Sequence, residues 1–179
     1  ESIYSQFAIS LNCAADGNKA EEAIEKLHKR LIELYPTYEV FEARFIKIQY
    51  SKKFLNTNLV AKYIVNKIDK YYENREIIRD DGSIEHILGE TNDDKYSLNI
   101  GNLILLEIGV NRDCENFEFS EKKKQYKGSK YSGVEEFLKK YDSLGNWGQE
   151  QIVERSKELA KLIYINNANY SISRETEQM

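Results

Sequence analysis

Three polar residues in the middle of the chain could together hydrolyse a phosphodiester bond. His86, Asn102 and Asn111 each lie at the edge of an apolar run, and Glu85 stands directly before the histidine. A histidine with an ordinary pKa near ~6.5 can take a proton from water around neutral pH. A divalent cation on oxygen ligands can neutralise the phosphate, and an asparagine can orient the histidine or its loop. This set of residues predicts a one-metal phosphodiesterase site.

A strand–loop–strand–helix unit would bring these residues together. An Asp-Gly turn signal precedes the apolar run SIEHIL, which predicts a short strand that carries His86. The run IGNLILLEIGVN predicts a second strand, which the chain enters through Gly101. The residues after Asn111, as far as about Gly128, predict a short helix. Each candidate residue would then lie at the end of a strand or at the start of a helix.

Helical patterns dominate the chain up to about residue 78. Apolar residues spaced three and four apart line one face of a helix that Pro36 closes. A second helical segment is expected from about Tyr38 to Ile48. A third segment carries apolar residues on one side, and either Asn56 or Asn58 could cap its start.

Helices also follow the central unit. Ser132 and Glu135 fit a capping box at the start of one helix, and the last helix is expected to carry apolar residues from Ile152 to Ile163. The final stretch, SISRETEQM, has no periodicity, which predicts a frayed end. The predicted division is a helical lead-in over residues 1–78, a core with flanking C-terminal helices over residues 79–168, and a flexible tail over residues 169–179.

Composition narrows the class of protein. The chain has 179 residues, of which 41% are hydrophobic and 31% charged, as in soluble globular proteins. No window approaches the roughly 18 unbroken apolar residues of a membrane span, so no membrane partner is expected. The formal net charge of −4 argues against a protein that coats nucleic acid non-specifically. Cys13 and Cys114 lack metal or redox spacing, which predicts reduced, buried thiols in a cytoplasmic protein.

One basic run could nevertheless contact a phosphate backbone. The stretch EKKKQYKGSKY holds five lysines and two tyrosines. Such a run is usually a solvated face, but beside hydrolytic residues it is the best candidate for salt-sensitive, sequence-independent binding of nucleic acid. The candidate nucleic-acid-binding residues are Lys122, Lys123, Lys124, Lys127 and Lys130.

Taken together, these motifs resemble the HNH nuclease domain at the C-terminus of GmrSD-type, modification-dependent restriction endonucleases. The resemblance rests on EHIL, on GNLILLE, on Asn111 nine residues after Asn102, and on the pattern F-x-x-K-K-K-x-Y-x-x-S. Trp147 and an I-x-x-R motif that begins at Ile152 also fit the family pattern. The resemblance covers about residues 83–165 and implies a mostly α fold with a small ββα-metal (HNH) nuclease core, of the α+β class.

The resemblance implies a role for each matching residue. His86 would be the general base, and Asn102 would orient the loop that carries it. Glu85 and Asn111 would hold the metal, with Asn111 also counted among the catalytic residues. The implied cofactor is a divalent ion, Mg²⁺ first and Mn²⁺ as an alternative. One of the three consecutive lysines would meet the phosphate, and the sequence does not fix which one.

The implied function is a metal-dependent HNH endonuclease that nicks or cleaves DNA. It would be the effector part of a modification-dependent, anti-phage restriction protein, with modified phage DNA as substrate. Its partner would be an N-terminal nucleotide-binding domain of the same or of another protein. Gly89 and Glu90 stand where the family pattern has proline and glutamine. Two alternatives therefore stay open: a non-catalytic DNA-binding or assembly module with a decayed motif, and an RNA-directed nuclease.

Overall fold

The computed structural model describes residues 2–51, 55–73, 81–90, 95–114 and 117–176. These residues form eight α-helices, one 3₁₀ helix and one two-stranded antiparallel sheet, which confirms the predicted mostly α fold with a small β core. Contacts divide the chain into two compact units, residues 1–37 and residues 38–179. The predicted boundary near residue 78 lies outside the described residues, and the helix that ends before it, at Glu73, packs against the sheet.

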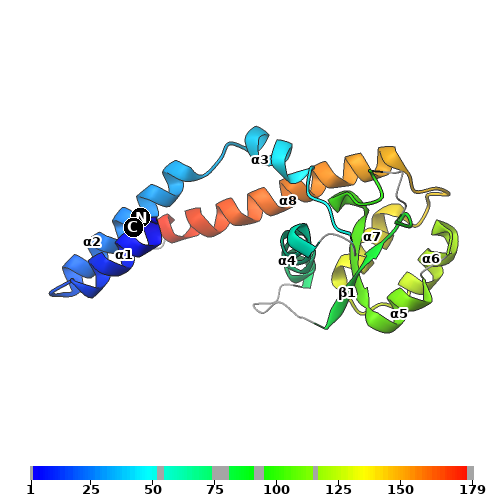
Figure 1. Cartoon of the computed structure of the whole chain (residues 1–179), viewed down its shortest axis with the longest axis horizontal. Helices are drawn as coiled ribbons and strands as arrows, with labels where there is room; N and C mark the ends of the chain where they lie inside the picture. Colours follow the sequence, from blue (N-terminus) through cyan, green and yellow to red (C-terminus); the bar gives the residue numbers. More distant parts are fainter. Residues whose placement is uncertain (1, 52–54, 74–80, 91–94, 115–116, 177–179) are drawn as a thin grey trace. The chain divides into compact units, whose positions relative to one another are not determined.

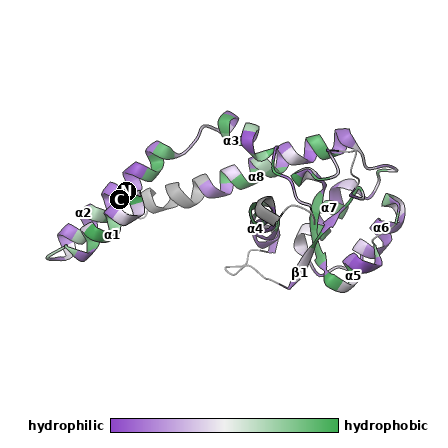
Figure 2. Ribbon diagram, in the orientation of Figure 1, coloured by the Kyte–Doolittle hydropathy of each residue, from purple (hydrophilic) through white to green (hydrophobic). Residues whose placement is uncertain are grey.

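The first unit is a pair of helices, α1 (Ile3–Asn12) and α2 (Gly17–Leu34). A side-chain cap starts each helix: the Ser2 hydroxyl accepts the backbone N–H of Ser5, and the Asp16 carboxylate accepts that of Lys19. Polar and apolar residues alternate along both helices (Figure 2), but neither helix contains a buried residue. This unit therefore has no dry core of its own.

The two cysteines differ in their surroundings. Both are free thiols, as predicted, and Cys114 is buried. Cys13 is exposed, so the prediction of a buried thiol is wrong at this position. The reason is that Cys13 follows α1, in the unit that has no buried helical residues.

The second unit opens with α3 (Tyr38–Phe45) and α4 (Leu55–Glu73). Asn58 does not cap α4, because the helix begins before it, at Leu55; the side chain of Asn56, the other candidate, lies outside the described residues. Asn58 is buried instead, and its side-chain oxygen accepts the backbone N–H of Ser51 at 3.1 Å. A contact with the preceding segment thus replaces the predicted local cap.

The sheet is the centre of this unit. Strand β1 (Gly82–His86) runs antiparallel to β2 (Leu103–Glu107), with Gly82 opposite Glu107 and His86 opposite Leu103. Both strands were predicted, and the four leucine and isoleucine residues of β2 are all buried. Helices α4 and α7 (Ser132–Tyr141) pack on β2, whereas α5 (Ile108–Asp113) packs against both strands. Figure 1 shows the sheet between α4 and the pair formed by α5 and α6 (Phe119–Tyr126).

The segment from Asn111 to Gly128 holds two helices rather than the single helix predicted. Helix α5 starts directly after β2, and Asn111 lies inside it. The helix ends at Cys114, whose backbone N–H reaches the carbonyls of Val110 and Asn111. A new helix, α6, begins at the buried Phe119.

Helix α7 starts differently from its predicted capping box. Ser132 is the first helical residue, and Tyr131 occupies the cap position without a side-chain hydrogen bond. The backbone N–H of Gly133 is satisfied by the buried Asp69 of α4, whose Oδ1 accepts it at 2.8 Å. The cap therefore comes from another helix, which a local motif cannot predict.

The last helix, α8 (Gln149–Thr176), is longer than predicted. It continues through the expected tail as far as Thr176, since neither glycine nor proline interrupts the sequence after Gly148. None of the described helices, α8 included, combines the length and the hydropathy that a membrane span requires.

Helix α8 fixes the entry to β2 through a close backbone approach at Gly101. This glycine lies in the 3₁₀ helix η1 (Ile100–Asn102), which packs against α8. A Cβ at Gly101 would overlap the carbonyl oxygen of Ile152 and would lie 3.0 Å from the backbone nitrogen of Ser156. Only glycine lets the two backbones pack this closely.

Gly101→Ala should therefore destabilise the protein by about 2–3 kcal/mol, because the two backbones must separate. The matched control is Gly109→Ala in α5, where an added Cβ meets nothing within 4 Å. The control should be neutral, or stabilising by up to about 1 kcal/mol. Urea denaturation of both variants measures the difference, and equal stabilities would contradict the packing argument.

Candidate active site

The side chain of Asn102 binds the backbone of the loop that follows His86. Its side chain is fully buried at the end of η1. The side-chain oxygen accepts the Leu88 backbone N–H at 2.7 Å and the Trp147 indole N–H at 3.0 Å. The side-chain nitrogen donates to the carbonyls of Leu88 at 2.7 Å and Ser97 at 2.6 Å. Because the side-chain amide of Asn102 binds both the N–H and the carbonyl of Leu88, it fixes the backbone two residues beyond His86.

His86 ends β1, where its side chain is buried. Its Nε2 lies 3.1 Å from the carbonyl oxygen of Tyr50. A carbonyl can only accept, so Nε2 carries the proton and Nδ1 keeps a free lone pair. Burial lowers the pKa of His86 below its ordinary value of 6.5, against opposing effects of the Tyr50 carbonyl and the Glu90 carboxylate. The ring is therefore neutral at pH 7, which is the state that a general base requires.

Glu90 also belongs to this site, although the sequence identified it only as a departure from the family pattern. Its Oε2 lies 3.9 Å from Nδ1 of His86, which is longer than a hydrogen bond. Its Oε1 accepts the hydroxyl of Ser51 at 2.7 Å. The carboxylate is partly exposed, so it lies between the buried imidazole and solvent. The sequence feature that could have identified Glu90 as a site residue is its position four residues after His86.

Glu85 is engaged with Lys122 of α6. Successive side chains of a strand point to opposite faces, so Glu85 and His86 diverge. Glu85 Oε1 accepts Lys122 Nζ at 2.5 Å, and the same Nζ donates to the carbonyl oxygen of His86 at 2.6 Å. The side chains are only 7% and 2% exposed. The predicted metal ligand and a predicted phosphate-binding lysine thus pair with each other inside the protein.

Asn111 joins α5 to the beginning of β1. Its side-chain nitrogen donates to the hydroxyl of Ser83 at 2.8 Å and to the carbonyl of Ile84 at 3.0 Å. The hydrogen bond of the His86 ring instead goes to Tyr50, at the other end of the strand. The fold therefore brings Glu90 near His86 and lets Asn102 hold the loop after it, while Asn111 binds the first residues of β1.

The side chains in this arrangement do not fit a divalent ion held by Glu85 and Asn111. Within the described ranges, no three histidine, cysteine, aspartate or glutamate residues lie together as metal ligands. The Glu85 carboxylate already carries an ammonium group at 2.5 Å, which would repel a second cation at the same oxygen. The requirement for Mg²⁺ or Mn²⁺ stays a prediction.

The five candidate lysines do not share one surface. Lys122 is buried, and Lys123 donates to the carbonyls of Asp142 and Leu144, beyond the end of α7. The other three lysines are exposed: Lys124 pairs with Glu121, Lys127 pairs with Asp142, and Lys130 follows α6. Lys122 thus lies in the protein interior, Lys123 is bound to the segment that follows α7, and the other three lysines face solvent.

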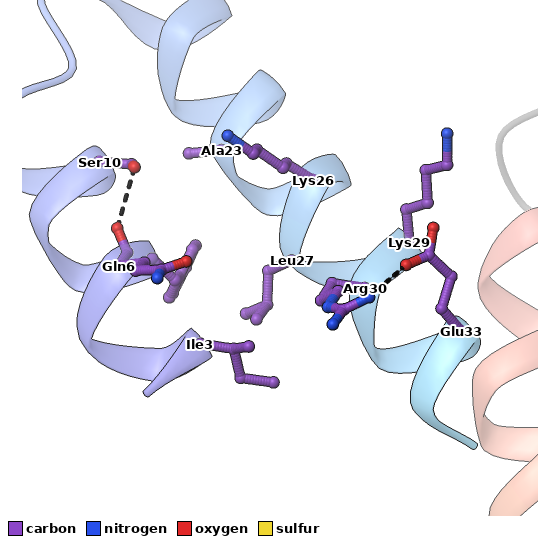
Figure 3. Close-up of a pocket in the computed structure, with 10 residues that line it drawn as sticks. Ile3, Gln6, Ser10, Ala23, Lys26, Leu27, Lys29, Arg30 and Glu33 are labelled. Carbon is purple, nitrogen blue, oxygen red and sulfur yellow. Dashed lines mark hydrogen bonds and ion pairs between the residues drawn. The ribbon is translucent and has the colours of Figure 1, made fainter. Parts of the chain in front are cut away.

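A hollow of about 460 Å³ lies in the first unit, between α1 and α2. Figure 3 shows Ile3 and Leu27 facing each other there, with Arg30 paired to Glu33 at one end. None of the predicted site residues lines this hollow. The candidate chemistry therefore belongs to the second unit alone.

Comparison with known protein families gives one match. Residues 35–162, well over half of the chain, match the family described as GmrSD restriction endonucleases, C-terminal domain. The matched region includes every candidate site residue, and it confirms the resemblance stated from the motifs. A search of curated proteins found no match.

Asn102→Ala should destabilise the protein by about 3 kcal/mol, because it leaves the partly buried peptide groups of Leu88 and the buried indole N–H of Trp147 without partners. It should also speed hydrogen exchange at the Leu88 amide. Asn66→Ala is the matched control, since Asn66 makes one local bond, to the Lys62 carbonyl within α4. The control should change stability by less than about 0.5 kcal/mol. Similar losses in both variants would show that Asn102 does not fix the loop.

Proposed function

This chain belongs to the family of GmrSD restriction endonuclease C-terminal domains, and from this premise we propose that it hydrolyses DNA with His86 as general base. The observation that supports this role is the Nε2 contact with the Tyr50 carbonyl, which leaves Nδ1 able to accept a proton. The wider role that we propose is the effector part of modification-dependent, anti-phage restriction. Its substrate would be modified phage DNA, and an N-terminal nucleotide-binding domain would be its partner.

In the proposed reaction, Nδ1 of His86 removes a proton from water as the water oxygen attacks phosphorus. The bond from phosphorus to the leaving oxygen breaks, and that oxygen takes a proton from solvent. The imidazolium that forms is stabilised at Nε2 by the Tyr50 carbonyl and at Nδ1 by the Glu90 carboxylate, 3.9 Å away. Asn102 contributes by fixing Leu88, so that the histidine does not move with a loose loop.

The three exposed lysines are the proposed contacts to the phosphate backbone. Lys124, Lys127 and Lys130 come from the end of α6 and the segment after it. The ion pairs of Lys124 with Glu121 and of Lys127 with Asp142 are solvent-exposed and hence weak, so a phosphate can compete for these two ammonium groups. Contacts of this kind read the backbone and not the sequence.

The competing proposal is a non-catalytic DNA-binding or assembly module. Two observations favour it: Gly89 and Glu90 depart from the family pattern, and Lys122 occupies the carboxylate expected to hold the metal. An RNA-directed nuclease is a further alternative, because backbone contacts alone do not select DNA.

The catalytic proposal predicts that His86→Ala lowers plasmid nicking at least about 100-fold, which is the usual contribution of a general base. The control is His28→Ala, the other histidine of the chain, which should nick like the wild type. Reactions with Mg²⁺, with Mn²⁺ and with EDTA test the predicted metal requirement, and an RNA substrate tests the RNA alternative. Equal rates for wild type and His86→Ala would favour the non-catalytic module.

The lysine proposal predicts weaker binding after Lys124→Gln, Lys127→Gln and Lys130→Gln are combined in the His86→Ala background. Affinity should fall similarly for all DNA sequences, and the slope of log affinity against log salt should decrease by about 2–3. The control combines Lys62→Gln, Lys157→Gln and Lys161→Gln, which removes the same charge from exposed positions of α4 and α8. If both triple variants bind alike, the effect is one of net charge and not of a site.

A further inference from the structure

Lys122 is a buried cation with two oxygen partners. The residue is 2% exposed, although ammonium groups are rarely buried unless paired. Its Nζ lies 2.5 Å from Glu85 Oε1 and 2.6 Å from the carbonyl oxygen of His86. Both partners belong to the end of β1, whereas the lysine comes from α6. The ammonium group of Lys122 therefore links α6 to Glu85 and His86 at the end of β1.

The other groups near Glu85 do not supply a competing cation. The hydroxyl of Tyr126 lies 3.4 Å from Glu85 Oε1, and the neighbouring Cys114 is a buried thiol. Burial, with the nearby Glu85 charge, raises the pKa of Cys114 to about 11, so the thiol stays neutral. In the described surroundings of Glu85, Lys122 is the positive charge that balances the carboxylate.

We propose that Lys122 is a tethered cation that takes, at Glu85, the place expected for a divalent ion. Its contacts resemble those of a small hard cation, with a carboxylate and a carbonyl oxygen on one charge. By holding the His86 carbonyl it also fixes the peptide from which the imidazole projects. Lys122 is thus a positioning residue for His86, and this second part rests on the proposed function.

The test compares Lys122→Met, Glu85→Gln and the double variant by thermal unfolding, with and without millimolar Mn²⁺. Lys122→Met should lower Tm by about 10 °C, because it leaves a carboxylate buried without its partner. Mn²⁺ should recover part of that loss in Lys122→Met and should leave the wild-type Tm unchanged. The double variant should regain most of the Tm and should not respond to Mn²⁺, since its side chains at both positions are neutral.

A spectroscopic measurement tests the positioning role separately. The ¹⁵N shifts of the His86 ring should report an Nε2–H tautomer in the wild type and in Lys122→Arg, and a mixture of tautomers in Lys122→Met. The chain has only two histidines, so His28 serves as the internal reference. Neither measurement needs nuclease activity. The proposal about Lys122 and Glu85 can thus be confirmed even if the protein has no nicking activity, and it can be contradicted even if the protein is an active nuclease.

Three results would overturn the proposal. The first is a wild-type Tm that rises with Mn²⁺ and loses this response in Glu85→Gln, because Glu85 would then hold the metal despite Lys122. The second is a Lys122→Met variant as stable as the wild type. If Lys122→Met does not fold, the double variant decides: folding supports charge compensation, and a failure of the double variant as well contradicts it.

Discussion

The fold of the second unit depends on one buried carboxamide. Asn102 joins three segments of the chain: the loop after β1 at Leu88, the segment before η1 at Ser97, and the approach to α8 at Trp147. A primary amide is suited to this position because it offers two donors and an acceptor with two lone pairs. Aspartate would place an anion against two carbonyls, and alanine would leave buried partners unpaired. The geometry of the candidate base therefore depends on a side chain that holds the loop two residues beyond it.

A second buried group holds Asn102 itself in place. Arg155 of α8 donates to the carbonyls of Gly101 and Leu103, which flank Asn102, at 2.6 and 2.9 Å. Burial lowers the pKa of Arg155 to about 10, so the guanidinium is still charged at neutral pH. The ring of Phe137, 5.2 Å away, offers its negative face to the same cation. Together with the close approach at Gly101, these contacts connect α8 to the start of β2 and hence to the loop after His86.

Local patterns predicted the parts of this site that depend on local interactions. Apolar runs and turn residues predicted both strands, and the motifs predicted the family that the comparison confirms, whereas the roles of His86 and Asn102 stay predictions. The capping box at Ser132 failed because Asp69 of α4 supplies the cap through space. The pairing of Glu85 could not be predicted, since three consecutive lysines are equivalent in sequence. Only the direction in which α6 presents each lysine makes Lys122 the buried one.

Two carboxylates on either side of His86 illustrate how environment assigns different roles to the same chemical group. Glu85 is buried and paired with a lysine, so its carboxylate links β1 to α6 inside the protein. Glu90 is partly exposed, holds a neutral hydroxyl and lies 3.9 Å from the unprotonated ring nitrogen. A carboxylate in that position favours positive charge on the imidazole. Glu90 therefore places a carboxylate 3.9 Å from the ring nitrogen at which the proposed base would gain a proton.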